Sequence, residues 1–275
     1  MKLSDGYSIP YLEGGRDNGV VDNVLLLIHG FGSNKDSFSS ITNYLTPKMR
    51  VIIPDLPGFG ATVKSFDEDY TVSKQAERIN MFIEALGLSS VHIGGSSMGG
   101  GVSGIFVTKY PDKVLSVWLL SPATGTATAR ASDVLTHYDR TGESILLPGT
   151  YEEFHTMFNH IFNNKPYIPT FILNMVADEY IRHRAIHEFV FNMNINKTNN
   201  LPQILNTSRY QNPILLMWGD KDRILHVNAA YELLEHVPHT QLIIMNDVGH
   251  CPHMEKPEES ARHYLHFRKL LIEEE

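Results

Sequence analysis

The stretch VHIGGSSMGGGVSG, residues 91–104, contains six glycines and three serines. An apolar strand pattern leads into it, and a helical pattern follows it. A sharp turn from a strand to a helix crowds the residues two before and two after the one at its tip, and glycine is favoured there because it has no side chain. Gly95 and Gly99 hold these positions around Ser97. The stretch therefore predicts a strand–turn–helix that presents the Ser97 hydroxyl at its tip.

The same glycine frame argues against the other two serines. Ser96 would need a glycine two residues later, where Met98 stands. Ser103 has Ile105 two residues later and falls within the predicted helix. A serine hydroxyl is a weak nucleophile unless a histidine accepts its proton and a carboxylate orients that histidine. Ser97 is therefore a candidate nucleophile only if such partners follow it in the chain.

Strand and helix patterns alternate around this stretch. Short apolar runs that end in turn residues are typical of strands buried on both faces. The runs are NVLLLIHG (23–30), VIIPDLPGFG (51–60), SVHIGG (90–95), VLSVWLLSP (114–122), NPILLMWGD (212–220) and TQLIIMND (240–247). Residues 71–88 repeat apolar side chains at steps of three and four, with Thr71 as N-cap and Gly87 as C-cap of a helix. The alternation predicts an α/β fold with a mostly parallel central sheet flanked by helices.

The alternation is interrupted once. Between residues 123 and 210 the sequence has the character of helices and loops rich in Phe, Met and Ile, with few strand-like runs. An interruption of this length has the size of a small subdomain. The sequence thus predicts a core domain formed by residues 1–122 and 211–275, and a helical cap formed by residues 123–210.

Composition and charge exclude several classes of function. The 275 residues carry a formal net charge of −8 without a basic stripe, which argues against nucleic acid as a partner. Cys251 is the single cysteine, so the chain can form no internal disulfide and no cysteine-based zinc cluster. No apolar run approaches the roughly 18 residues of a membrane span, and no secretory signal pattern opens the sequence. We expect a cytoplasmic protein, unless a leader or anchor was removed from its start.

Candidate partners for Ser97 follow the last two predicted strands. The segment GDKDRIL offers Asp220 and Asp222 as acids, and NDVGHCPHMEKP offers His250 as the base. Both segments come just after the carboxyl ends of strands, where ligands bind in open α/β sheets. The chain order serine, acid, histidine is the one that a G-x-S-x-G turn requires. The sequence therefore contains the parts of a catalytic triad.

A third requirement is a pair of backbone N–H groups that stabilise an oxyanion. One belongs to the residue after the nucleophile, here Met98, and the other comes from an early strand-to-helix loop. The motif HGFG (29–32) follows the first apolar strand, which makes the N–H of Phe31 the second candidate. His29 is interpreted as a structural hydrogen-bonding residue rather than a base.

The motifs HGFG, DLPGFG, GGSSMGG, WGDKDRIL and DVGHCPHMEKPEE occur in an order that resembles the α/β-hydrolase superfamily over nearly the whole chain. The segments SMGG and LLSPA, and a helical insertion containing LLPGTYEEF, look most like its lipase and monoacylglycerol-lipase branch. In that branch the acid sits in G-x-x-D, which matches Asp222 and leaves Asp220 as the rival. The histidine sits in G-H-x-P-x-x-E-x-P, which matches His250.

This resemblance implies the α/β-hydrolase fold with a helical cap inserted after the sixth strand. It implies a carboxylesterase or lipase that needs neither a cofactor nor a metal. The substrate would be a small-molecule ester, either a medium-chain acyl ester or a monoacylglycerol, cleaved through an acyl-enzyme on Ser97. The cap would shape an apolar pocket, and the protein could contact lipid peripherally. Candidate pocket residues are Phe154, Phe158, Phe162 and Met175.

The sequence leaves other functions open. Hydrolysis of a C–C bond in a vinylogous diketone uses a similar core and triad, and its anionic substrate needs an inward-pointing arginine. Arg182, Arg184 and Arg209 are available for that role. Perhydrolase chemistry and a non-turnover receptor on the same fold are further alternatives. His183 and His187 share a helix face, but the H-E-x-x-H pattern of zinc proteases is absent.

Overall fold

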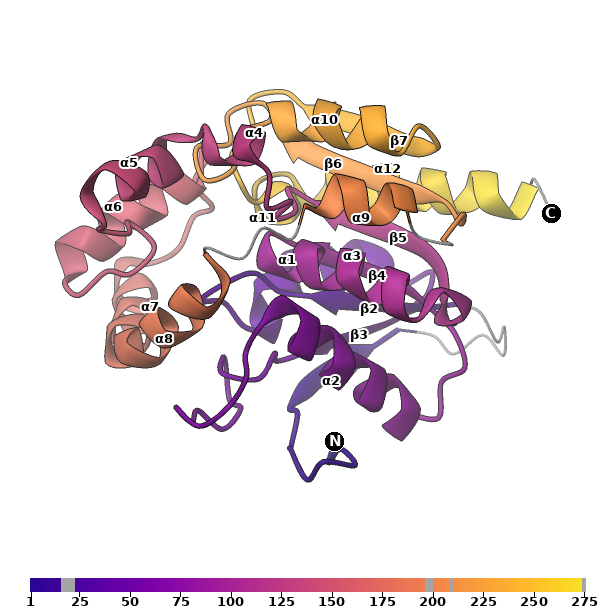
Figure 1. Cartoon of the computed structure of the whole chain (residues 1–275), viewed down its shortest axis with the longest axis horizontal. Helices are drawn as coiled ribbons and strands as arrows, with labels where there is room; N and C mark the ends of the chain where they lie inside the picture. Colours follow the sequence, from indigo (N-terminus) through magenta and orange to yellow (C-terminus); the bar gives the residue numbers. More distant parts are fainter. Residues whose placement is uncertain (16–22, 196–199, 208–209, 274–275) are drawn as a thin grey trace.

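The computed structural model describes residues 1–15, 23–195, 200–207 and 210–273, which Figure 1 shows as a sheet with surrounding helices. The sheet has seven strands in the order β1-β3-β2-β4-β5-β6-β7. β1 runs antiparallel to β3, and the other neighbours pair in parallel. The strands are β1 (Tyr11–Gly14), β2 (Val24–Ile28), β3 (Arg50–Pro54), β4 (Val91–Ser96), β5 (Val114–Leu120), β6 (Ile214–Gly219) and β7 (Thr240–Met245). The predicted mostly parallel α/β sheet is confirmed.

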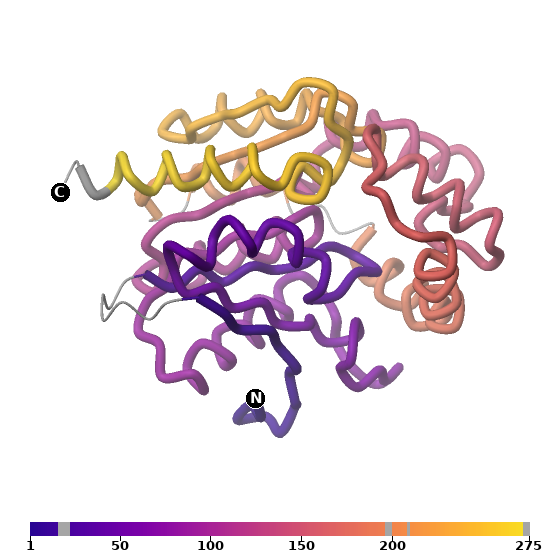
Figure 2. The backbone as a smooth tube through the Cα atoms, turned by 180° about the vertical axis from the view of Figure 1, so that it is seen from behind, coloured from indigo at the N-terminus to yellow at the C-terminus, as the bar shows by residue number. Residues whose placement is uncertain are grey.

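Helices cover both faces of this sheet. The α-helices are α1 (Ser39–Leu45), α2 (Val72–Ala85), α3 (Met98–Lys109), α4 (Ala127–Arg130), α5 (Asp133–Thr141), α6 (Tyr151–Ile161), α7 (Thr170–Arg182), α8 (Arg184–Asn194), α9 (Leu201–Thr207), α10 (Asn228–His236), α11 (Pro252–Glu255) and α12 (Pro257–Glu273), and two short 3-10 helices span Lys35–Phe38 and Pro111–Lys113. α1 and α12 pack on one face, where the rings of Trp118 and Tyr264 stack 4.4 Å apart. Figure 2 shows these two helices in front of the sheet. α2, α3 and α10 pack on the opposite face. Because both faces are covered, all five residues of β2 are buried.

The helical pattern predicted in residues 71–88 forms α2, and two residues explain its ends. The Thr71 hydroxyl accepts the N–H of Lys74 at 3.3 Å and so satisfies one of the first-turn donors. Gly87 has φ +69°, and its N–H donates to the Glu84 carbonyl at 3.0 Å. A residue with a side chain adopts this left-handed conformation only with strain, so glycine ends the helix here.

The helices α4 to α9 lie between β5 and β6. Figure 1 shows α5 to α8 gathered at one end of the sheet, beyond the carboxyl ends of its strands. The insertion follows the fifth strand and not the sixth, which corrects our expectation. A cap after the sixth strand would need two strands before β2, but the described segment there forms only β1. The pairing of Lys2 with Ser8 is an isolated bridge and does not count as a strand of the sheet.

Helix α9 lies within the range predicted for the cap, yet it packs on the core. A Cβ added at Gly104 of α3 would lie 2.4 Å from the Leu201 side chain, so the missing side chain makes room for α9. The cap has a small apolar core of its own, formed by Phe154, Met157, Ala177 and Tyr180. These contacts join α6 to α7, which explains why two helices without a sheet beneath them keep a fixed arrangement.

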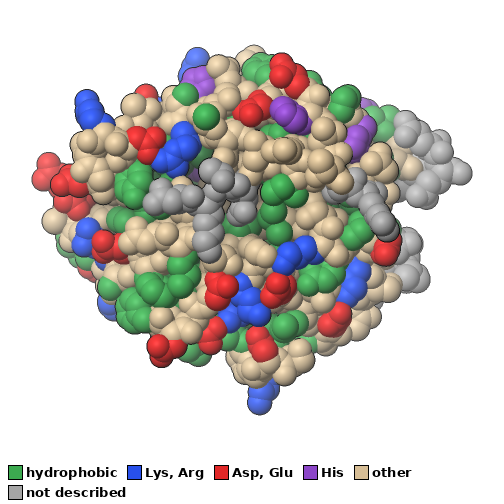
Figure 3. Space-filling model, viewed as in Figure 1, with side chains coloured by type: hydrophobic (Ala, Val, Ile, Leu, Met, Phe, Trp, Pro, Cys, Tyr) green, Lys and Arg blue, Asp and Glu red, His purple; other side chains and the backbone are tan. Residues whose placement is uncertain are grey.

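The described residues bear on two expectations from the sequence, that the protein does not bind nucleic acid and that it does not span a membrane. On the face in Figure 3, Lys and Arg side chains lie among Asp and Glu side chains. A phosphate backbone requires cations gathered into a patch or stripe. None of the helices in the described part of the chain has both the length and the apolar character of a bilayer span.

Candidate active site

Ser97 occupies the turn between β4 and α3 with φ 55° and ψ −119°. A positive φ is a strained conformation for a residue with a side chain. The flanking glycines allow the turn to be this tight. A Cβ at Gly95 would lie 2.2 Å from the Gly99 carbonyl oxygen, and a Cβ at Gly99 would lie 2.1 Å from that of Ile28. The glycine spacing that selected Ser97 is therefore a steric requirement of the turn.

Backbone hydrogen bonds hold Ser97 at the ends of the strands. Its N–H donates to the Leu120 carbonyl at 2.9 Å, and its own carbonyl accepts the N–H of Ala123 at 2.8 Å. Gly30 of the HGFG turn lies opposite, because a Cβ there would approach the Ser97 Cβ to 3.2 Å. The serine turn and the HGFG turn are thus in direct contact.

His250 and Asp222 form a buried hydrogen-bonded pair. His250 Nδ1 lies 2.8 Å from Asp222 Oδ2, and the Asp222 side chain has no exposed surface. Asp222 Oδ1 accepts the backbone N–H groups of Ile224 at 2.8 Å and Leu225 at 3.0 Å. Both carboxylate oxygens are therefore engaged. A proton on Nδ1 fits this arrangement, and it leaves Nε2 of His250 as the basic nitrogen.

Asp220, the rival acid, and Asp247, which lies three residues before His250 and could also orient it, make other contacts. Asp220 accepts the N–H of Val248 at 3.3 Å. Asp247 accepts hydrogen bonds from the side chains of Asn164 and Asn163, which hold the pKa of its carboxyl below the usual value. Of the three carboxylates, Asp222 is the one that the structure brings to the histidine ring.

His29 supports the HGFG turn. Its Nδ1 lies 2.8 Å from the Gly30 carbonyl oxygen, and its Nε2 accepts the N–H of Leu56 at 2.9 Å. Both ring nitrogens are engaged and burial lowers the pKa, so the ring is neutral and structural. Met98 is the first residue of α3, where an N–H group has no acceptor one turn earlier in the helix. Phe31 and Met98 both line the cavity beside Ser97, so their N–H groups are candidate oxyanion donors.

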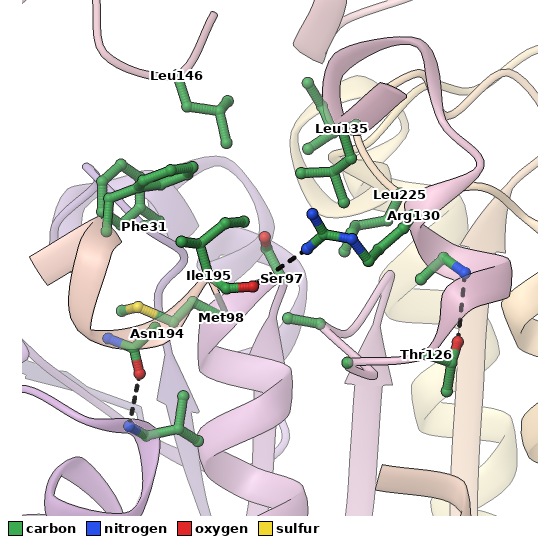
Figure 4. A pocket seen from close by; sticks show the side chains of 16 residues that line it. Phe31, Ser97, Met98, Thr126, Arg130, Leu135, Leu146, Asn194, Ile195 and Leu225 are labelled. Carbon is green, nitrogen blue, oxygen red and sulfur yellow. Dashed lines mark hydrogen bonds between the residues drawn. The ribbon is translucent and has the colours of Figure 1, made fainter. Parts of the chain in front are cut away.

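A cavity of about 420 Å³ opens beside Ser97. Figure 4 shows residues of the core and of the insertion side by side around it, with Ile195 beside Met98 and Leu225 beside Arg130. Most of the side chains that line it are apolar, and they include Phe31, Met98, Leu135, Leu146, Phe191 and Leu225. Arg130 of α4 and Asn194 of α8 line it too, although the sequence had singled out neither of them.

The four residues expected to line the pocket lie elsewhere, which corrects our expectation. The side chains of Phe154 and Phe162 are 2% and 4% exposed, and Phe154 packs against Tyr180 in the core of the cap. The Phe158 ring lies against the Phe162 ring at 4.6 Å. Met175 is 66% exposed. The apolar pattern indicated burial for some of these residues but not the surface against which they are buried.

The loop that carries His250 is bonded to the end of α6. The His250 N–H donates to the Ile161 carbonyl at 2.8 Å. Glu255 accepts the N–H of Gly249 at 2.9 Å through one oxygen, and those of Asn163 at 3.1 Å and Asn164 at 2.7 Å through the other. Motif spacing placed Glu255 near the histidine. Its contacts with the insertion depend on tertiary structure, so sequence spacing gave no signal for them.

The arginines named for an anionic substrate do not line this cavity. Arg182 pairs with Glu179 at 3.0 Å, and Arg184 Nε donates to the Leu147 carbonyl at 3.0 Å. Arg209 lies outside the described residues. The cationic side chain at the cavity is Arg130 instead.

The described residues contain no group of three or more side chains arranged to hold a metal ion. The rings of His183 and His187 lie 6.3 Å apart. His187 stacks on Phe59 and packs against Tyr180, and burial lowers its pKa to about 4. This histidine belongs to the aromatic contact between the cap and the HGFG turn.

Comparison with known proteins gives consistent matches. A sequence profile of the family described as "alpha/beta hydrolase fold" matches residues 23–143 and 151–257. Lipase 3 of Moraxella sp. (strain TA144) is 35% identical over 98% of this chain and 83% of its own length. Monoacylglycerol lipase abhd6-A of Xenopus laevis is 29% identical over 86% of this chain and 73% of its own. The crystal structure of a bacterial membrane phospholipase A superposes with a TM-score of 0.92 at 33% identity, covering 98% of this chain and 84% of that one.

Proposed function

The chain belongs to the α/β-hydrolase family and is a carboxylic ester hydrolase, and we propose that Ser97, His250 and Asp222 carry out the hydrolysis. The observation that carries this assignment is the 2.8 Å contact between the buried Asp222 carboxylate and His250 Nδ1. A serine on a strained turn at the same edge of the sheet completes the set. Medium-chain acyl esters and monoacylglycerols are the proposed substrates.

The proposed reaction proceeds in two acyl-transfer steps. His250 Nε2 takes the proton of the Ser97 hydroxyl as its oxygen attacks the ester carbonyl. Asp222 keeps the imidazole in the required tautomer and stabilises the imidazolium that forms. The alcohol leaves with a proton from His250, and an acyl-enzyme remains on Ser97. Water deprotonated by His250 then releases the carboxylic acid and frees the serine.

The N–H groups of Phe31 and Met98 are the proposed oxyanion donors. Negative charge develops on the carbonyl oxygen during each attack, and preorganised backbone donors stabilise it without reorganisation. The α3 N-terminus adds the favourable end of the helix dipole at Met98. Gly30 and Gly99 support this role because their missing side chains let the two turns approach each other.

The cavity supports an apolar acyl group in the substrate. Its volume of about 420 Å³ lies in the range of small-molecule sites, and its lining is mostly aliphatic and aromatic. We propose that the insertion acts as a cap that covers the bound acyl chain. Phe171 and Met175 of α7 are 67% and 66% exposed, which supports peripheral contact of the cap with lipid. A cytoplasmic location stays a prediction.

A substrate panel with two proteins tests this function. Wild type and Ser97→Ala are compared on nitrophenyl esters of increasing chain length, on a monoacylglycerol and on a vinylogous diketone. We expect wild type to turn over esters repeatedly and Ser97→Ala to lose that activity while its thermal unfolding stays unchanged. Wild-type-like ester hydrolysis by Ser97→Ala would contradict the assignment. A burst that stalls after one turnover would favour a receptor, and preferential cleavage of the diketone would favour a C–C hydrolase.

A further inference from the structure

Arg130 is the one charged side chain among the described residues that line the cavity beside Ser97. It is the last residue of the short helix α4. Figure 4 shows its side chain reaching from α4 into the cavity toward Ile195 and the side of the cavity where Ser97 lies. In a mostly apolar site, a guanidinium can bind a polar group of the substrate and so fix its orientation.

Two protein acceptors already contact this guanidinium. Arg130 Nη1 donates to the Ile195 carbonyl at 3.1 Å, and Nη2 donates to the Asp139 carboxylate. These contacts span α4, α5 and the end of α8, so they fix the head group in position. A guanidinium carries five N–H donors, more than these two acceptors use. A substrate that fills the cavity displaces water from the other donors and has to offer oxygen acceptors in its place.

Apart from Ser97, the other polar side chains that line the cavity form hydrogen bonds within the protein. The Thr126 hydroxyl accepts the N–H of Ala129 at 3.2 Å. Asn194 accepts the N–H of Val72 at 3.0 Å and donates to the carbonyls of Tyr70 and Val190 at 3.1 and 2.8 Å. Their hydrogen-bonding groups shape the backbone around the site. Recognition of a polar substrate group therefore falls to Arg130.

The charge around Arg130 indicates which kind of acceptor fits. Asp139 neutralises the guanidinium, so the pair together carries no net charge. A substrate carboxylate would meet Asp139 at close range and gain little from the paired cation. A neutral hydroxyl or carbonyl oxygen accepts from the remaining N–H groups without that repulsion. The site thus favours a neutral oxygen-rich group over an anion.

We propose that Arg130 is a specificity-determining residue that binds the hydroxyl oxygens of a neutral polyol leaving group. This inference rests on the proposed ester hydrolysis at Ser97 and narrows its substrate class to acyl esters of polyols such as glycerol. The acyl chain then contacts the apolar lining from the cap, which includes Leu135 and Leu146. The two parts of an amphiphilic ester therefore meet different surfaces of one cavity.

A matched pair of substrates tests the proposal. 1-Octanoylglycerol and propyl octanoate share the acyl group and the number of alcohol carbons, and they differ by two hydroxyls. We expect wild type to prefer 1-octanoylglycerol in kcat/KM by about tenfold or more, the size of one hydrogen bond to a charged donor. Arg130→Gln should lower that ratio about tenfold. Arg140→Gln, at an exposed position of α5, removes the same charge and should leave the ratio unchanged.

The outcomes separate this inference from the proposed function. A wild-type ratio near one, or an equal loss of both substrates in Arg130→Gln, would overturn the role of Arg130 while ester hydrolysis stands. A wild-type ratio near one overturns the proposal even if Arg130→Gln does not fold. Octanoyloxyacetate, which carries a carboxylate in place of the diol, should be a poorer substrate than 1-octanoylglycerol. The reverse preference would refute the inference that Arg130 binds a neutral leaving group. If Ser97→Ala keeps wild-type ester hydrolysis, the proposed function itself is refuted.

Discussion

Replacing Asp222 with asparagine tests the proposed catalytic pair most directly. Asparagine has one oxygen and one NH2 group where Asp222 has two oxygens. The N–H groups of Ile224 and Leu225 both point at Oδ1 and require an oxygen there. The NH2 group then faces His250 Nδ1, which lies 2.8 Å from Oδ2 in the structure. The ring has to carry its proton on Nε2, and it can no longer accept the proton of Ser97.

The opposite amide orientation restores the active tautomer but leaves two buried backbone N–H groups without an acceptor. Each such group costs about 1–3 kcal/mol, so the active orientation is disfavoured by about 2–6 kcal/mol. At tenfold per 1.36 kcal/mol, this corresponds to a loss of about 30-fold to 10⁴-fold in kcat. The upper end agrees with the loss of about 10⁴ for the equivalent change in another serine triad.

The assay is steady-state hydrolysis of a nitrophenyl ester, with thermal unfolding to show that each variant is folded. Asp220→Asn is the matched control, because the Asp220 side chain is 27% exposed and makes a weak 3.3 Å contact with the Val248 N–H. It should stay within about threefold of wild type, as surface substitutions usually do. The reasoning is refuted if Asp222→Asn keeps more than a tenth of the wild-type kcat, or if Asp220→Asn is the crippling change.

Two further predictions concern stability. Gly99→Ala places a Cβ 2.1 Å from the Ile28 carbonyl oxygen and 2.5 Å from that of His29. The free energy of unfolding, measured in urea, should therefore fall by about 1–3 kcal/mol. An unchanged midpoint would contradict the steric argument. The His187 pKa is lowered from 6.5 to about 4 by burial, so the unfolded chain binds a proton first and stability falls as the pH drops from 6.5 to 4. Between pH 7 and pH 4, the free energy of unfolding of His187→Leu in urea should fall by about 3 kcal/mol less than that of wild type. An equal fall in both proteins would refute this.

The core, the Ser97 turn and the Asp222–His250 contact could be predicted because their signals are local. The crowding at Gly95 and Gly99 follows from a single turn, and glycine is the residue that permits it. Asp222 comes just after the buried strand β6 and His250 just after the half-buried edge strand β7, and parallel strands bring their carboxyl ends to one edge. A short stretch of sequence therefore determined each feature, and the sheet determined how they meet.

The pocket could not be predicted because it depends on how helices pack. The pattern of α6 marks Phe154 for burial, but it cannot distinguish the core of the cap from the wall of the cavity. Arg130 lies in a helix of four residues, which is too short for a periodic pattern. The direction of its side chain is set by Asp139 and by the Ile195 carbonyl, contacts that exist only in the folded chain.

The cap also supports the loop that carries His250, the proposed base. The carbonyl of Ile161 holds the His250 backbone, and Glu255 joins Gly249 to the N–H groups of Asn163 and Asn164. Moving the end of α6 away from the core would break these bonds and leave the N–H of the buried His250 and the half-buried Glu255 carboxylate without these partners. Substrate entry that preserves the catalytic geometry therefore has to leave this end of α6 in place, so any opening motion must come from other parts of the insertion.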